Sequence, residues 1–416
     1  MRREMHMGVV AEIDFRPRNV SWGSFLSGAF LLTLSTLTIS GCSTPTRMTA
    51  VPYDETVQAL PLGLPNARFF PVRQSDDLLR EAADSSQRER QALGLAADAQ
   101  MPHADFLAIS GGADDGAFGA GLLAGWGEEG DRPTFQLVTG VSTGALIAPF
   151  AFLGSKYDQQ LKDMFTTISA KDVFEDRGIS GLLFDDAMAD TTPLANRIAH
   201  FVTPEMMTDL ANEYRKGRLL FIGTTDLDAQ EPCLWNIGAI AASGRPGALD
   251  LIRKVLRASA AVPGAFQPVL FDVSVNGIVH QELHVDGGAI GQLFLYPPNI
   301  DLRTQPFRDR RAYLIRNGRQ DSEWTEVEPR TMSIAARAIS TMIKYSGRGD
   351  VSRVYATTQR DGVDYNLADI GPDFVTKESG TFEPAYMKAL FDYGYQKALH
   401  GYPWKKVPPI IDPAQK

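Results

Sequence analysis

The sequence contains few of the residues that build disulfide frameworks and metal sites. Of its 416 residues, 2 are cysteines (Cys42 and Cys233) and 6 are histidines. The two cysteines could pair, but a disulfide framework is excluded by their number. His280 and His284 are spaced like the ends of an H-E-x-x-H zinc motif. However, the glutamate stands at the wrong position, and on a strand the two imidazoles would lie about 13 Å apart. We therefore expect no metal site.

Basic tracts are absent, and so are long apolar runs beyond residue 42. The formal net charge is −9 at pH 7. No cluster of lysine and arginine with interleaved aromatic residues occurs, which argues against a nucleic-acid partner. No further segment is long and apolar enough to predict a membrane span. Apolar residues still make up 44% of the chain, which is enough for a large core but fixes no oligomeric state.

A mostly apolar run, 25–39, follows several arginines near the N-terminus and ends at Ile39-Ser40-Gly41-Cys42. The run is short for a membrane span and is typical of a signal peptide. Its end resembles the lipobox of bacterial lipoproteins, which implies that 1–41 is removed and that Cys42 is acylated and anchors the protein to a membrane. Because Ser43 follows the cysteine, we expect an exported protein on the bacterial outer membrane, facing the periplasm or the surface. The alternatives are an ordinary signal peptide with a chance cysteine and a cytoplasmic protein with a buried apolar helix.

Composition divides the rest of the chain into three parts. Residues 42–74 are polar, contain several prolines and lack periodicity, which predicts a tether between the lipid and the folded domain. Residues 75–320 are expected to form the main domain. Residues 321–416 are expected to form a helical extension that packs on this domain.

Two consecutive units of strand, glycine turn and helix indicate an α/β domain with a mostly parallel sheet. The strands are 105–110 and 135–139; the helices are 117–129 and one ending near residue 153. Asn276-Gly277 between two apolar runs predicts a β-hairpin. Further helices are expected from Ser75 and over 158–168, 193–202, 204–215, 248–260, 329–345 and 384–400, and further strands over 218–225, 269–275, 278–285 and 311–316. The apolar segment 178–184 is predicted to be a core-facing loop, with a membrane-touching lid as the alternative.

Residues 140–144, Gly-Val-Ser-Thr-Gly, form a G-x-S-x-G motif between a predicted strand and a predicted helix. A serine nucleophile needs such a tight turn, and Gly140 and Gly144 permit the close backbone approach. The motif alone would occur by chance in roughly one chain in ten of this length. The apolar strand before it and the small-residue helix after it favour Ser142 as a nucleophile.

The glycine turn 111–116 could supply the hydrogen-bond donors that a serine nucleophile needs for a developing oxyanion. The N–H groups of Gly111, Gly112 and Ala113 precede a helix, where backbone donors lack helical partners, and Gly116 closes the turn. A plain tight turn and a phosphate cradle are the alternatives. The dinucleotide-binding pattern G-x-G-x-x-G does not fit this segment.

Asp286 is the preferred candidate for the catalytic base. It ends a predicted strand, where α/β folds place functional groups, and Gly287 and Gly288 follow it. A structural Asp-Gly turn is the alternative. A triad in the order Ser, Asp, His would instead require His400, whose place near a helix C-terminus has a simpler electrostatic explanation. Cys233 lies in an apolar stretch and is predicted to be a buried structural thiol.

Taken in order, these motifs resemble the patatin-like phospholipase family, whose members use a serine–aspartate dyad without histidine. The family's G-G-G-x-K/R-G oxyanion block is similar to 111–116, and its nucleophile elbow to 140–144. Its Ala-Ser-x-Ala-x-Pro-x-x-Phe-x-Pro block is similar to 258–268, and its D-G-G/A block to 286–288. The resemblance covers about residues 104–290.

The resemblance implies a three-layer α/β/α sandwich and a catalytic domain over 75–320. Ser142 would attack an acyl ester, Asp286 would take its proton, and the N–H groups of 111–113 would bind the oxyanion, without a metal or cofactor. The implied substrate is a membrane lipid, which makes the chain a phospholipase A or lysophospholipase of a bacterial lipoprotein type. A general esterase, an acyltransferase and an inactive lipid-binding or scaffold module are the alternatives.

Two residues depart from the family's pattern. Ala113 replaces the third glycine, and Asp115 stands where lysine or arginine is usual. Alanine has less backbone freedom than glycine. A carboxylate at position 115 would oppose a developing oxyanion unless its side chain points away.

Overall fold

The computed structural model describes residues 47–416 except 177–188, 305–307, 378–379, 410 and 412–416. The contacts between residues divide the chain into two units, Met1–Ser43 and Thr44–Lys416. The second unit contains its own hydrophobic core. The expected signal peptide, Cys42 and the segment 178–184 all lie outside the described residues.

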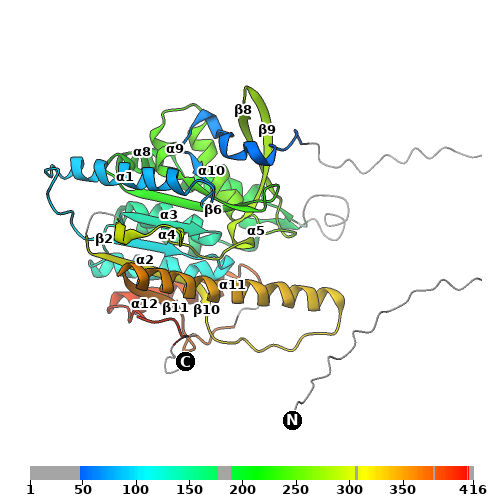
Figure 1. Cartoon of the computed structure of the whole chain (residues 1–416). Helices are drawn as coiled ribbons and strands as arrows, with labels where there is room; N and C mark the ends of the chain where they lie inside the picture. Colours follow the sequence, from blue (N-terminus) through cyan, green and yellow to red (C-terminus); the bar gives the residue numbers. More distant parts are fainter. Residues whose placement is uncertain (1–46, 177–188, 305–307, 378–379, 410, 412–416) are drawn as a thin grey trace, which may run out of the picture. The chain divides into compact units, whose positions relative to one another are not determined.

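A nine-stranded sheet forms the centre of the second unit (Figure 1). Its parallel strands lie in the order β6 (Leu219–Asp226), β3 (Leu137–Val141), β2 (Ala104–Ile109), β10 (Arg310–Arg319) and β11 (Asp364–Ile370). The antiparallel strands are β7 (Glu231–Asn236), β1 (Arg68–Phe69), β8 (Val269–Val275) and β9 (Ile278–Asp286). The β8–β9 hairpin joins the sheet where β9 pairs with β6. The predicted α/β class with a mostly parallel sheet is confirmed.

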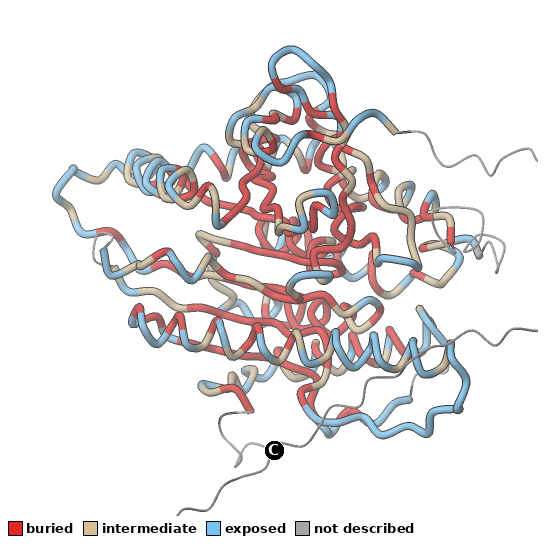
Figure 2. Tube along the Cα trace, turned by 45° about the vertical axis from the view of Figure 1, so that its right-hand side comes forward, coloured by how far each residue is buried: buried red, intermediate tan, exposed pale blue. Residues whose placement is uncertain are grey.

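The parallel strands β2 and β3 and the first half of β6 are mostly apolar, as expected for strands with both faces buried (Figure 2). In β10, Tyr313 and Ile315 point into the core on one face of the sheet. Ala312 and Leu314 point into a second core on the other face. Alternate side chains of β10 therefore pack against the two helical layers on opposite faces of the sheet.

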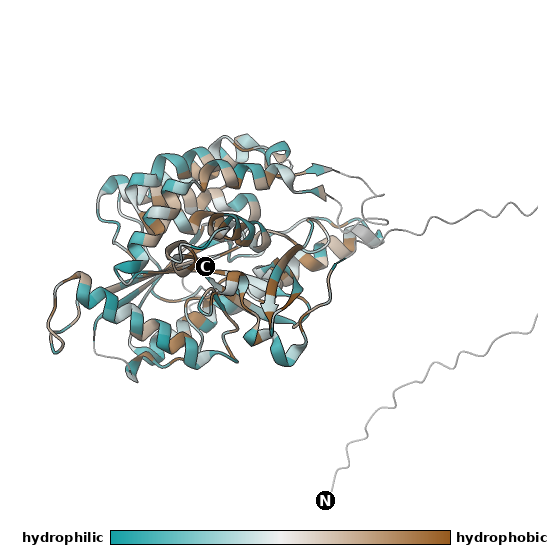
Figure 3. Ribbon diagram, turned by 90° about the horizontal axis from the view of Figure 1, so that it is seen from above, coloured by the Kyte–Doolittle hydropathy of each residue, from teal (hydrophilic) through white to brown (hydrophobic). Residues whose placement is uncertain are grey.

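Helices cover both faces of the sheet, as expected for an α/β/α sandwich. One layer contains α2 (Gly116–Glu129), α3 (Thr143–Leu153), α4 (Asp158–Thr166), α7 (Thr192–Phe201), α8 (Pro204–Arg215), α10 (Ala248–Ser259) and α12 (Pro384–Leu399). The opposite layer contains α1 (Ser75–Ala92), the second half of α11 (Thr331–Asp361) and the segment 290–302. The outer helices contain many hydrophilic residues (Figure 3). Among the described helices, none combines the length and apolarity needed to cross a membrane.

The C-terminal part of the chain is integral to the domain. α12 packs on α2, and β11 extends the parallel sheet beside β10. The prediction of a helical extension over 321–416 is therefore wrong at β11, which adds a core strand beyond the predicted strand 311–316. The strand is hard to recognise in the sequence because it contains several polar residues. In the structure, lysines further along the chain pair with its aspartates: Lys405 Nζ lies 2.6 Å from Asp369 Oδ1.

The predicted tether is packed on the domain from residue 47 onward. Short 3-10 helices form at Tyr53–Gln58 and Pro61–Gly63, and β1 pairs with β7. Phe70 is only 1% exposed, and the buried guanidinium of Arg68 lies 2.6 Å from Glu282. The expectation of a loose tether is therefore wrong for this part of the segment, where prolines mark turns between short packed elements.

Candidate active site

The carboxyl ends of β2, β3 and β10 meet where the strand order reverses. The chain runs from β2 to β3 and β6 on one side, and it returns later to β10 and β11 on the other side of β2. Ligands of α/β sheets bind in the crevice outside the strands at such a switch point. The predicted nucleophile and the predicted oxyanion turn both follow strands that end there.

Ser142 lies between β3 and α3 in a strained conformation. Its φ of 56° and ψ of −127° fall in a region that costs on the order of 1–3 kcal/mol for an L-residue. Gly144 permits this turn, because a Cβ there would lie 2.3 Å from the carbonyl oxygen of Ile109. The geometry is that of a nucleophile elbow, with the serine at the positive end of a helix.

The backbone of Asp286 is fixed at the end of β9. Its N–H donates to the carbonyl oxygen of Ala261 at 2.9 Å. Its carbonyl oxygen accepts the Thr225 hydroxyl at 3.0 Å. Neighbouring segments on both sides of β9 therefore hold the carboxyl group in place.

The carboxyl group of Asp286 faces Ser142. It accepts the Gly288 N–H at 2.7 Å and is hydrogen-bonded to the Ser142 side chain. Burial raises the pKa of Asp286 to about 7, although the hydrogen bonds from Ser142 and Gly288 act to lower it. A carboxyl group with this pKa can both accept and return a proton near neutral pH.

Ser259 anchors the nucleophile from α10. Its hydroxyl accepts the Ser142 N–H at 3.0 Å and donates to the Gly223 carbonyl oxygen at 2.6 Å. Ser259 is fully buried. It belongs to the block 258–268, which carried the family resemblance without suggesting a role for this residue.

The turn after β2 lies directly against Ser142. A Cβ on Gly111 would lie 3.0 Å from the Ser142 Cβ and 3.7 Å from its Oγ. However, the Gly111 N–H donates to the carbonyl oxygen of Gln292 at 3.0 Å. An acceptor from a distant segment therefore occupies the Gly111 N–H in this structure, and its role as an oxyanion donor stays a prediction.

Gly112 and Ala113 keep their N–H groups available. Within the described part of the chain, neither group has a hydrogen-bond acceptor. Gly112 packs so tightly that a Cβ would lie 2.1 Å from the carbonyl oxygen of Asn317. Ala113 adopts a φ of 50°, which costs an L-residue about 1–2 kcal/mol. This strain explains why glycine suits the third position of the motif.

Two polar residues of β10 support the turn. Arg316 Nη1 donates to Ser110 Oγ at 3.0 Å and to the Gly111 carbonyl oxygen at 2.8 Å. Asn317 donates its side-chain amide to the Ser110 carbonyl oxygen at 2.8 Å. The buried guanidinium places a fixed positive charge beside the turn. Sequence reasoning missed both residues, and their place at the end of a predicted strand was the only available signal.

The carboxyl group of Asp115 is engaged with α12. The Tyr386 hydroxyl donates to its Oδ1 at 2.6 Å. Burial raises the pKa of Asp115 to about 6, against the opposing effect of the Tyr386 hydrogen bond. The neighbouring Asp114 accepts the Phe382 N–H at 2.9 Å. Both acids therefore fasten the turn to the C-terminal part of the domain.

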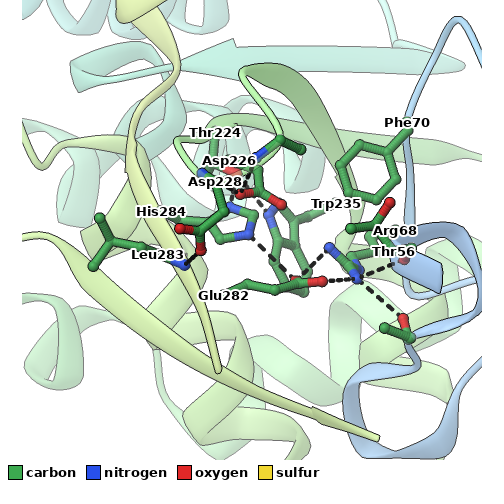
Figure 4. A network of polar contacts seen from close by, with 12 residues as sticks. Thr56, Arg68, Phe70, Thr224, Asp226, Asp228, Trp235, Glu282, Leu283 and His284 are labelled. Atoms are coloured by element: carbon green, nitrogen blue, oxygen red, sulfur yellow. Dashed lines mark hydrogen bonds and ion pairs between the residues drawn. The ribbon is translucent and has the colours of Figure 1, made fainter. Parts of the chain in front are cut away.

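A buried network of charged residues lies along β9 next to Asp286 (Figure 4). Candidate ligand atoms of Asp226, Glu282 and His284 lie within 4.8 Å of one another. Arg68 contacts both oxygens of Glu282, at 2.6 and 2.7 Å. Because the guanidinium already neutralises Glu282, the arrangement suits a charge network that fixes β9 better than a metal centre.

The histidines take other roles. His284 Nδ1 is 2.9 Å from a hydroxyl of β6, at Thr224, and the exposed His400 bonds within its own helical turn. Among the described residues, no hydrogen bond joins a histidine to Ser142 or Asp286. Cys233 is fully buried and unpaired, and burial raises its thiol pKa to about 12. Its predicted structural role is confirmed.

An apolar cavity of about 220 Å³ lies beside the site. Its lining includes Val141 and Gly287, the direct sequence neighbours of Ser142 and Asp286. The rest of its wall is mainly the segment 290–298 and α11.

The fold and the site define an α/β/α hydrolase with a serine nucleophile elbow. Residues 107–297 match the family model described as patatin-like phospholipase. The matched range includes the elbow, the oxyanion turn, Ser259 and Asp286. The chain therefore contains a patatin-like phospholipase domain over residues 107–297. No curated protein is significantly similar to the chain.

Proposed function

We propose that the protein hydrolyses acyl esters of membrane lipids, as a phospholipase A or lysophospholipase, with Ser142 and Asp286 as its catalytic dyad. One observation carries the proposal: the strained serine is hydrogen-bonded to a buried carboxyl group whose pKa is about 7. The unpartnered N–H groups beside the serine supply the other element that acyl transfer needs.

In the proposed first step, Ser142 Oγ attacks the acyl carbonyl carbon and its proton passes to Asp286. The resulting oxyanion accepts the N–H groups of Gly112 and Ala113, each worth about 3–4 kcal/mol in the transition state. The alcohol of the lipid then leaves with the proton from Asp286. In the second step, Asp286 takes a proton from water, the hydroxyl attacks the acyl-serine, and Ser142 recovers its proton as the fatty acid leaves.

The length of the substrate's acyl chain is inferred from the apolar cavity beside the proposed dyad. Its lining at Val141, Leu293 and Phe294 is apolar, which suits a long acyl chain better than a short one. This feature favours a lipid over a small soluble ester as the physiological substrate.

Membrane attachment is a separate proposal. We propose that the mature protein is exported and held at the outer membrane by acylated Cys42. Support comes from the apolar run 25–39 and the lipobox-like sequence that ends at Cys42. Mass spectrometry of the mature N-terminus should find an acylated cysteine, and a Cys42→Ser variant should lose membrane attachment. An unmodified N-terminus would refute this proposal.

The activity is tested with the compact unit 44–416 on phospholipid vesicles and on a soluble ester. Ser142→Ala and Asp286→Asn should each lower product release by about a thousandfold or more, as expected for members of a catalytic unit. His400→Ala is the matched control and should keep wild-type rates. Hydrolysis that survives Ser142→Ala would refute the dyad, and loss in His400→Ala would point to a triad. Activity on the soluble ester alone would leave a general esterase.

A further inference from the structure

The first half of α11 projects past the rest of the domain (Figure 1). It exposes large apolar side chains. The exposed fractions are 53% for Ile334, 52% for Ile339, 64% for Met342, 38% for Ile343 and 57% for Tyr345. Ile339, Met342 and Ile343 are three and four residues apart, so they lie on one side of the helix. Monomeric soluble proteins seldom expose such a continuous apolar surface without a function.

The polar side of the same half-helix is the side that contacts the protein. Arg337 donates to the Glu323 carbonyl oxygen, and Lys344 Nζ lies 2.8 Å from Glu323 Oε2. A helix on a domain surface normally turns its apolar side to the core and its polar side to water. In this half-helix the polar side faces the protein and the apolar side faces outward, which indicates that the apolar side binds a partner.

The second half of α11 connects this surface to the candidate active site. Asp350 accepts the N–H of Gln292 at 2.7 Å, and Gln292 is the residue that holds the Gly111 N–H. Gly347 lies against the guanidinium of Arg316 beside the oxyanion turn, where a Cβ would come within 2.8 Å of it. The exposed apolar surface therefore belongs to the helix that borders the site.

We infer that the apolar side of residues 334–345 docks on the phospholipid bilayer that contains the substrate. Between residues 331 and 349 the helix carries no acidic residue, so no carboxylate of this segment would repel anionic lipid phosphates. Trp324, 88% exposed on the preceding loop, and Tyr345 are of the type that occupies membrane interfaces. Apolar residues on one side with lysine and arginine on the other are typical of helices that lie in the interface.

This inference rests on the proposed function. Two assays, vesicle binding and hydrolysis of a soluble ester, distinguish a failure of the docking inference from a failure of the proposed function. The probe for docking is flotation of the 44–416 unit with vesicles of diether phosphatidylcholine and phosphatidylglycerol, which have no acyl ester to hydrolyse. Ile339→Gln together with Ile343→Gln should weaken vesicle binding by about tenfold or more, because two large apolar side chains no longer enter the bilayer. The same variant should hydrolyse a soluble ester at the wild-type rate.

A matched control removes apolar residues elsewhere that are at least as exposed. Ile278→Gln with Val279→Gln changes side chains that are 61% and 52% exposed on the β8–β9 hairpin, which lies beyond β6 and away from α11. This control should bind vesicles like the wild type. Equal binding by the α11 variant, or a wild type that hydrolyses the soluble ester but does not bind vesicles, would overturn the inference. So would a wild-type dimer that dissociates in the α11 variant, because a second copy would then cover the surface. A wild type without activity on any ester would refute the proposed function instead.

Discussion

Asp286→Asn should make the protein more stable while it abolishes the proposed activity. The carboxyl group is 4% exposed, and burial raises its pKa from 3.8 to about 7. Its charged form is therefore unfavourable in the folded protein. Asparagine keeps an oxygen that can accept the Gly288 N–H, but it carries no charge at any pH.

The sign and the size of the effect follow from the two pKa values. Between pH 4 and pH 7 the unfolded chain loses this proton while the folded chain retains it, so the free energy of unfolding falls as the pH rises. Each unit of pKa shift corresponds to about 1.4 kcal/mol, so this one group lowers stability by up to about 4 kcal/mol across the window. Below pH 4 and above pH 7 its contribution should be nearly constant.

The measurement is urea unfolding of the 44–416 unit at several pH values from 4.5 to 8. The difference between Asp286→Asn and wild type should grow in favour of the variant up to about pH 7 and then level off. Ser142→Ala is the matched inactive control. It removes a hydrogen bond that lowers the Asp286 pKa, so its pH dependence should persist and extend to higher pH. If the Asp286→Asn difference does not vary with pH, the carboxyl group is not held neutral and the reasoning fails.

Three further outcomes are expected. The rate on a soluble ester should rise as the pH passes through about 7, because Asp286 must be ionised to act as a base; a flat profile from pH 5 to 9 would contradict that role. Ser259→Ala leaves the buried Ser142 N–H without its acceptor, so it should cost about 1–3 kcal/mol of unfolding free energy and lower kcat; unchanged values for both would show that the bond is dispensable. Gly112→Ala places a Cβ 2.1 Å from the Asn317 carbonyl oxygen, so the displaced turn should lower kcat by about tenfold or more with little change in KM; wild-type kinetics would rule out Gly112 as a close-packed donor.

The local pattern predicted the parts of the fold that depend on contiguous residues. Glycines with a small-residue helix identify the elbow at Ser142, and Asn276-Gly277 identifies the β8–β9 hairpin that the structure contains. The segment 47–70 was misread because its apolar residues lack any period. They are buried by separate short elements, such as β1 against β7.

Several contacts in the candidate site could not be predicted, because they join residues far apart in the chain. Gln292 occupies the Gly111 N–H, Arg316 supports the turn, and Ser259 holds the Ser142 N–H. No spacing rule connects such residues before the sheet is assembled. The role of Asp115 depends likewise on a tyrosine of α12, which only the packing of the C-terminal helix brings close.

The packing of residues 47 and 48 on the domain limits its distance from a lipid anchor at Cys42, if that anchor is present. Arg47 pairs with Asp228 at 2.8 Å, and the Met48 N–H donates to Gln281 at 2.8 Å, so the first described residues are already fixed to the domain. If Cys42 carries the lipid, five residue steps separate the anchor from this point, a reach of at most about 18 Å when fully extended. An acylated Cys42 would therefore hold the domain close to the leaflet that contains the lipid.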